Sequence, residues 1–244
     1  MSGGRSRILR IAELDLKLRR RVWPFAEERA DDILAHWRKR QAERPSLFDG
    51  RVLLMGEHQF VTRADGATIL SGEYFETDFK AFLAWRDFGF PDPSVCNGFS
   101  MAALQAADGA YLLGEMSDHT ANSGAIYFAA VTPDPSDVFD DRVDLLASVV
   151  RELEEETGLK TSDMVVADDW IVVDAAPRIA CLKPVRSAED AATLQTRIEA
   201  HLAREESPEL ARVHIVRSPA DIDETRMARF IVEFLRAAFE DAAP

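Results

Sequence analysis

The chain has 244 residues, of which 29 are Lys or Arg and 43 are Asp or Glu, and its formal net charge is −14 at pH 7. Hydrophobic residues make up 47% of it, which is enough for a core and excludes a chain that is disordered throughout. No apolar run approaches the roughly 18–20 residues of a membrane span, so no membrane association is expected. Arg5, Arg7 and Arg10 are not followed by an apolar stretch, which argues against a secretory signal and favours a cytoplasmic protein.

The acidic residues are concentrated beyond residue 50. Residues 1–50 carry 12 basic and 8 acidic side chains, whereas the rest of the chain carries 17 basic and 35 acidic ones. So acidic a region repels nucleic acid as a whole, and a nucleic-acid partner is not expected. A phosphate substrate would need local neutralisation of charge, which points to a divalent cation. Cys96 and Cys181 lie among apolar residues and are predicted to be buried free thiols.

Residues 1–94 are predicted to form an N-terminal α+β extension. The patterns indicate a strand over 8–18, a helix over 24–43, strands over 51–55, 60–63 and 67–70, and a helix over 78–88. Asp65-Gly66 predicts a hairpin turn. The aromatic residues of 71–90 favour packing in a core or between subunits, with stacking on a nucleobase as the alternative.

Residues 95–244 predict a second domain that alternates strands and helices. Strands are expected over 99–106, 110–114, 124–131, 164–173, 178–184 and 212–216, and helices over 144–157, 188–205 and 224–239. Asp108-Gly109 predicts a hairpin between the first two strands. A loop rich in Pro and Asp is expected over 132–142, and Gly158 stands where a left-handed residue ends a helix.

The predicted helix over 144–157 carries the chemistry. Glu152, Glu155 and Glu156 have the spacing i, i+3 and i+4, so they share one helix face, while Leu146, Val149, Val150 and Leu153 line the opposite one. Three like charges on one face destabilise a helix unless a cation lies between them. Mg²⁺ prefers oxygen ligands and retains waters that a phosphate can replace.

The segment from Arg151 to Leu159 resembles the signature of the Nudix hydrolase family, R-E-U-x-E-E-x-G-U, where U is aliphatic. Each specified position matches: Arg151, Glu152, Leu153, Glu155, Glu156, Gly158 and Leu159. The resemblance covers residues 95–244 and implies an α/β fold, an α/β/α sandwich around a mixed central sheet. A solvated acidic helix face is the alternative interpretation.

The upstream half of the family's box, G-x5-E-x7, departs from the pattern. Strict spacing puts Asp137 at the Gly and Val143 at the first Glu. A second alignment puts Val131 at the Gly and Asp137 at the Glu, and it requires six extra residues before Arg151. Either alignment puts loop geometry and substrate choice in doubt more than metal binding.

The resemblance implies roles for the matching residues. Glu152, Glu155 and Glu156 would bind Mg²⁺ or Mn²⁺, which neutralises a diphosphate and activates a water, and Arg151 would orient these carboxylates. A further acid, base or ligand is sought among Asp137, Glu205, Glu206 and Glu209. His119, in a turn between two strands, is a candidate substrate contact.

The implied function is metal-dependent hydrolysis of a nucleoside diphosphate linked to another moiety, by attack of water on a phosphorus. A nucleotide sugar is the favoured substrate, and a homodimer is a further expectation. One alternative is a nucleotide sensor with little or no turnover. Another is a pyrophosphohydrolase acting on RNA or a dinucleotide, for which the basic cluster over 17–21 is the motive, although pairing of this cluster with the acidic body is favoured.

Overall fold

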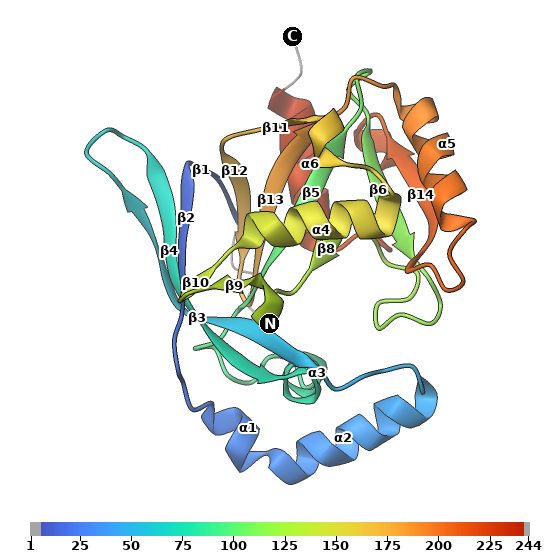
Figure 1. Ribbon diagram of the computed structural model, residues 1–244. Helices are drawn as coiled ribbons and strands as arrows, with labels where there is room; N and C mark the ends of the chain where they lie inside the picture. Colours follow the sequence, from blue (N-terminus) through green and yellow to red (C-terminus); the bar gives the residue numbers. More distant parts are fainter. Residues whose placement is uncertain (1–5, 242–244) are drawn as a thin grey trace.

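The computed structural model of the chain describes residues 6–241 (Figure 1). Within them, a mixed sheet of nine strands forms the larger part of the molecule. Its order is β1-β12-β13-β5-β6-β14, with β11, β8 and β7 paired to β13, β5 and β6. β13 and β5 run parallel, and the other pairs are antiparallel. The strands are β1 (Arg7–Ile11), β5 (Asn97–Gln105), β6 (Tyr111–Met116), β7 (Ile126–Tyr127), β8 (Ala130–Val131), β11 (Val165–Val166), β12 (Trp170–Ala175), β13 (Arg178–Arg186) and β14 (Leu210–Val216).

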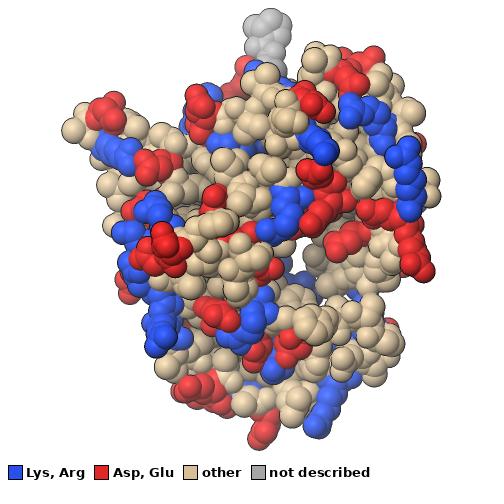
Figure 2. All heavy atoms as spheres, in the orientation of Figure 1, with Lys and Arg blue, Asp and Glu red and all other residues tan. Residues whose placement is uncertain are grey.

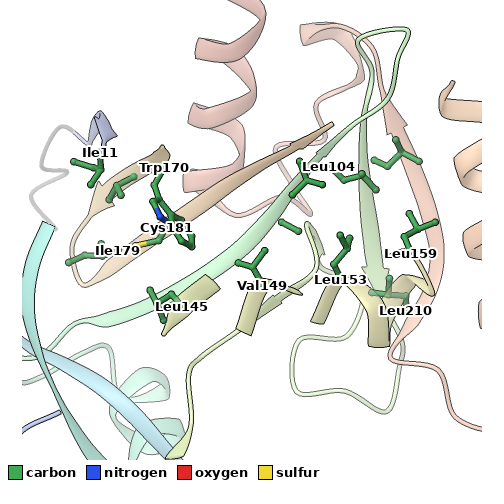
Figure 3. Close-up of a cluster of buried hydrophobic side chains, with 14 of the residues drawn as sticks. Ile11, Leu104, Leu145, Val149, Leu153, Leu159, Trp170, Ile179, Cys181 and Leu210 are labelled. Carbon is green, nitrogen blue, oxygen red and sulfur yellow. The ribbon is translucent and has the colours of Figure 1, made fainter. Parts of the chain in front are cut away.

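Helices cover both faces of this sheet, as predicted. α4 (Leu145–Thr157) and α5 (Ala191–Leu202) lie on one face and α6 (Arg229–Asp241) on the other. The side chains of β5 alternate between the two faces of the sheet, so that Leu104 packs on the α4 side and Met101 on the α6 side. Figure 3 shows Val149 and Leu153 of α4 directed at the sheet. The expected mixed α/β sandwich is confirmed.

A second sheet and three helices form what we call the N-terminal lobe; in Figure 1 its helices lie below the main sheet, and part of its sheet rises beside the main sheet on the left. The sheet order is β3-β4-β2-β10-β9, and β2 and β4 run parallel. Its elements are β2 (Glu13–Leu18), β3 (Arg51–Thr62), β4 (Thr68–Asp78), β9 (Val138–Phe139), β10 (Arg142–Val143), α1 (Pro24–Glu28), α2 (Ala30–Glu43) and α3 (Phe79–Asp87). The aromatic residues pack here as a core, as favoured, around the fully buried Trp85 and Phe75.

The two sheets share segments across residue 94. β1 pairs with β12 of the larger sheet, and β2, which starts two residues later, pairs with β4 of the smaller one. From the second half of the chain, β10 pairs with β2, and β9 pairs with β10 at the edge of the same sheet. The boundary between residues 94 and 95 stays a prediction.

Several predicted elements differ from the structure. The expected strand over 124–131 is two strands, because β7 pairs with β6 and β8 with β5, and the chain crosses between them at the buried Phe128. The last helix begins at Arg229 rather than residue 224, because Asp223 Oδ1 accepts hydrogen bonds from Thr225 and fixes a turn. Both predicted hairpins, at 65–66 and 108–109, are present.

Both cysteines are free and buried, as predicted. Burial raises the pKa of the Cys96 thiol to about 11 and that of Cys181 to about 12. Across residues 6–241, no helix combines the length and the apolar character that crossing a membrane requires.

Candidate active site

Helix α4 is defined by its caps and its apolar side. The Asp144 carboxylate accepts hydrogen bonds from the N–H groups of Leu146 (2.9 Å) and Ala147 (3.0 Å), which begins the helix. Gly158 ends it in the left-handed conformation (φ 68°). The buried side carries Leu145, Val149 and Leu153, whereas Leu146, expected on that side, is exposed.

The remaining face presents the three signature glutamates, which we call the acidic face (Glu152, Glu155 and Glu156). Glu155 is exposed, Glu152 is largely buried and Glu156 is only 6% exposed. Burial raises the pKa of Glu152 to about 7, and the charges of Glu155 and Glu209 contribute in the same direction. Burial also raises the pKa of Glu156 well above its usual value, with the charge of Glu152 adding to the effect.

Arg151 holds a buried carboxylate beneath the acidic face. Its Nη1 donates to Asp137 Oδ1 (2.6 Å), and its Nε donates to Glu152 Oε1 (3.2 Å). Asp137 is fully buried, and its Oδ2 accepts from the Asp134 backbone N–H (3.0 Å). The Asp137 carboxylate holds the arginine that orients Glu152. Both of its oxygens are therefore occupied by partners within the protein.

Asp137, which the second alignment puts at the first Glu of the upstream box, is the residue that contacts Arg151 (2.6 Å). The six extra residues of that alignment, 138–143, are the strands β9 and β10 with their turn at Asp140 (φ 56°). The pairing of β10 with β2, and of β9 with β10, makes both strands part of the N-terminal lobe's sheet. In this alignment, the irregular spacing corresponds to a hairpin inserted between Asp137 and helix α4.

Among the predicted additional carboxylates, Glu209 lies near enough to the acidic face for its charge to act there. Its charge raises the pKa values of Glu152 and Glu156, for both of which burial is the larger cause. The backbone holds its position, because Ser117 N–H donates to the Glu209 carbonyl (2.8 Å). Glu205 instead pairs with His201 (3.1 Å), and Glu206 is exposed.

A cleft of about 550 Å³ lies between the N-terminal lobe and the larger sheet, which is the size of a small-molecule site. Glu209 and His119 line it, together with Tyr127, Arg86 and Arg178. Figure 2 shows the hollow between the lobe and the body, with acidic atoms gathered above it and basic atoms within it. His119 also contacts Ser207 Oγ through its Nε2 (3.3 Å), and its role as a substrate contact stays a prediction.

The sequence did not identify Arg86, Arg178 or Tyr127 as site residues. They come from α3, β13 and β7, which are far apart in the chain and carry no shared motif. Burial raises the pKa of the Tyr127 hydroxyl, and the nearby charges of Glu156 and Glu209 raise it further. Tyr127 therefore connects the cleft to the acidic face.

The donor set fits a hard divalent cation. As the side chains stand, no three His, Cys, Asp or Glu residues of 6–241 are grouped closely enough to hold a metal. However, Glu156 Oε2 is buried and finds no hydrogen-bond partner among the described residues, an arrangement that costs free energy unless a ligand satisfies it. Carboxylate oxygens are the ligands that Mg²⁺ prefers, so the chemistry of Glu152, Glu155 and Glu156 suits this ion, although their side chains are not grouped around it as they stand.

No family model and no curated protein matches the sequence. Solved Nudix-type structures resemble the chain at low similarity. RenU, a Nudix hydrolase from M. smegmatis, is 14% identical with a TM-score of 0.40, over 60% of this chain and 85% of that one. The MutT protein from Methanosarcina mazei Go1 is 16% identical with a TM-score of 0.41, over 60% and 95%. A Nudix hydrolase from Nitrosomonas europaea is 13% identical with a TM-score of 0.35, over 60% and 90%. A likeness this low establishes neither membership of the family nor an activity.

Proposed function

We propose that the chain is a metal-dependent pyrophosphohydrolase that cleaves a nucleoside diphosphate linked to another moiety, with a nucleotide sugar as the first candidate substrate. The observation that carries the proposal is the acidic face of α4, on which the charge of Glu209 acts, together with a cleft large enough for a nucleotide that Glu209 lines. The orphan Glu156 Oε2 adds support, because a cation would satisfy it.

In this proposal, Glu152, Glu155 and Glu156 hold Mg²⁺ or Mn²⁺, which supplies charge neutralisation and lowers the pKa of an attacking water. Arg151 fixes Glu152 by its 3.2 Å bond, and Asp137 fixes Arg151. The water oxygen forms a bond to a phosphorus as the bridging P–O bond breaks. Glu209 is the candidate acceptor of the water proton, because it lies beside the acidic face and lines the cleft.

The test is release of phosphate and nucleotide from a panel of nucleotide sugars, dinucleotides and nucleoside triphosphates with Mg²⁺ or Mn²⁺. We expect one substrate class to turn over. The double variant Glu155→Gln/Glu156→Gln should lose at least about a hundredfold in kcat, because electrostatic stabilisation of this kind is worth several kcal/mol. Glu154→Gln is the matched control, since this exposed glutamate on the same helix pairs with Lys160 (3.2 Å). It should retain wild-type activity.

A nucleotide sensor is the second candidate. Val131 stands where the second alignment has the family's Gly, and the carboxylates do not form a closed ligand group as they stand. Metal-dependent nucleotide binding without turnover of any panel member would favour the sensor over the enzyme. The RNA hypothesis has less support, because Arg19 of the basic cluster pairs with Asp141 (2.9 Å). This is the pairing of the cluster with the acidic body that the sequence favoured.

A further inference from the structure

The cleft contains two arginines from different halves of the molecule, which we call the basic pair: Arg86 of α3 and Arg178 of β13. The charge of Arg86 lowers the pKa of Arg178, in addition to the larger effect of burial, so the two guanidinium groups lie close enough to repel. In a chain of net charge −14, two arginines brought together form a local positive site that attracts an anion.

Arg178 has no anionic partner among the described residues. Arginines that are partly buried normally bond to an oxygen, because an unpaired charge is costly to bury. This holds for Arg21, Arg40, Arg44, Arg86 and Arg151. In contrast, the Arg178 guanidinium lies over the Phe90 ring at 5.0 Å, and residues 6–241 provide it with no hydrogen bond or ion pair.

The charge of Arg86 is only partly balanced. Its Nε donates to Asp87 Oδ1 (3.0 Å), but the other oxygen of the same carboxylate also contacts His36 Nε2 (2.9 Å) and Arg40 Nε (3.6 Å). Asp87 therefore faces two arginines. Arg86 Nη1 has a neutral partner, Asn122 Oδ1 (3.1 Å).

A rigid platform supports Arg178. Phe90 adopts a left-handed backbone conformation (φ 59°), which is unfavourable for a bulky residue. Its ring packs against the fully buried Trp85 with centroids 4.7 Å apart. The surrounding core thus holds the ring in a strained position, where it contacts the guanidinium of Arg178.

The wall of the cleft continues from the basic pair towards the acidic face. Asn122, which accepts from Arg86, donates through Nδ2 to the Tyr127 hydroxyl (3.3 Å), and Tyr127 lies near the charges of Glu156 and Glu209. Asn97 pairs with Arg178 in register and accepts from Thr132 through Oδ1 (3.2 Å). Its amide N–H groups remain as donors at the cleft.

We propose that Arg178 and Arg86 form a phosphate-binding subsite of the cleft, which takes a phosphate group of the ligand directly and without a metal. Guanidinium groups match phosphate oxygens in geometry and charge, and such bonds are roughly twice as strong as neutral ones. The assignment of the ligand as a nucleotide rests on the proposed function. The affinity of the subsite for phosphate does not.

The test is calorimetric titration of the full chain with inorganic pyrophosphate in EDTA. We expect the wild type to bind, and Arg178→Gln and Arg86→Gln each to bind at least about tenfold more weakly, since a charge-assisted bond is lost. Arg51→Gln is the matched control. Arg51 also lines the cleft, but it pairs with Glu76 (2.6 Å) and Asp78, so its variant should bind as the wild type does.

Absence of metal-free binding by the wild type would overturn the proposal, as would equal binding by the wild type and both variants of the pair. If Arg178→Gln fails to fold by circular dichroism, Arg86→Gln decides. The result is separable from the proposed function. Binding that depends on the basic pair, without hydrolysis of any substrate, would contradict the proposed enzyme and support the subsite. Hydrolysis of a substrate without metal-free binding of pyrophosphate would contradict the subsite alone.

Discussion

The buried carboxylate of Asp137 makes Arg151 a determinant of stability. Asp137 is fully buried and Arg151 is 30% exposed, so Arg151→Met would leave a buried charge without its partner. Breaking a buried pair in this way typically costs about 3–5 kcal/mol, and we expect a loss of this order in the free energy of unfolding, measured with urea. Arg142→Met is the control, because Arg142 forms an exposed pair with Asp15 (3.1 Å). Its cost should stay below about 1 kcal/mol. Equal losses in the two variants would contradict a structural role for the buried pair.

Glu115 of β6 is expected to make stability depend on acid pH. Its Oε2 contacts His214 Nε2 (2.7 Å), Arg226 Nη1 (3.0 Å) and Arg212 Nε (3.3 Å). The hydrogen bond with His214, followed by the charges of Arg212 and Arg226, lowers the pKa of Glu115 below its usual value near 4.5. The stabilisation is therefore fully present above the unfolded-state pKa and is lost as pH falls through the folded-state pKa.

The measurement for Glu115 compares the wild type with Glu115→Gln in urea at pH 7 and at pH 3. The wild type should be more stable at pH 7, and the difference should shrink at pH 3, because Glu115 loses its charge as pH falls through its lowered folded-state pKa whereas Gln carries none. A difference that stays constant between the two pH values would show that the carboxylate charge contributes nothing.

At the scale of the element, the end of α4 depends on Gly158. A Cβ at this position would meet His201 Nδ1 at 2.6 Å, in addition to the cost of the left-handed conformation. Gly66 has a similar conformation (φ 87°), but open space surrounds it. We expect Gly66→Ala to cost about 1 kcal/mol from conformation alone. Gly158→Ala should cost more, as measured by thermal unfolding. Equal losses would mean that the His201 side chain moves away freely.

Local signals predicted the elements whose ends are set by nearby residues. Asp144 and Gly158 gave α4 nearly the bounds that it has, and Asp108-Gly109 gave the β5–β6 turn. The strand over 124–131 was not predicted correctly, because its division depends on pairing with two different partner strands. The same reason explains why only part of the candidate site was predicted from the sequence. The acidic face is encoded within one helix, whereas Arg86 and Arg178 meet only through the tertiary fold.

At the scale of the whole molecule, the N-terminal lobe and the larger sheet share one hydrophobic core. Leu16 and Leu70 of the lobe belong to the same buried cluster as Leu104 and Val149 of the larger sheet and α4. The strands β1 and β2 lie in different sheets although only Ala12 separates them. The cleft therefore lies between two parts that are tied together, which favours fixed positions for the acidic face and the basic pair.

This shared core predicts that the lobe and the larger sheet unfold together. Trp23, Trp37 and Trp85 are buried in the lobe, whereas Trp170 belongs to β12 of the larger sheet. In the variant Trp170→Phe, fluorescence reports on the lobe alone, while far-ultraviolet circular dichroism reports on the whole chain. We expect the two signals to give the same urea midpoint, because a single cooperative transition makes different probes coincide. An earlier fluorescence midpoint would show that the lobe unfolds independently, so the shared strands and core would not couple the two parts.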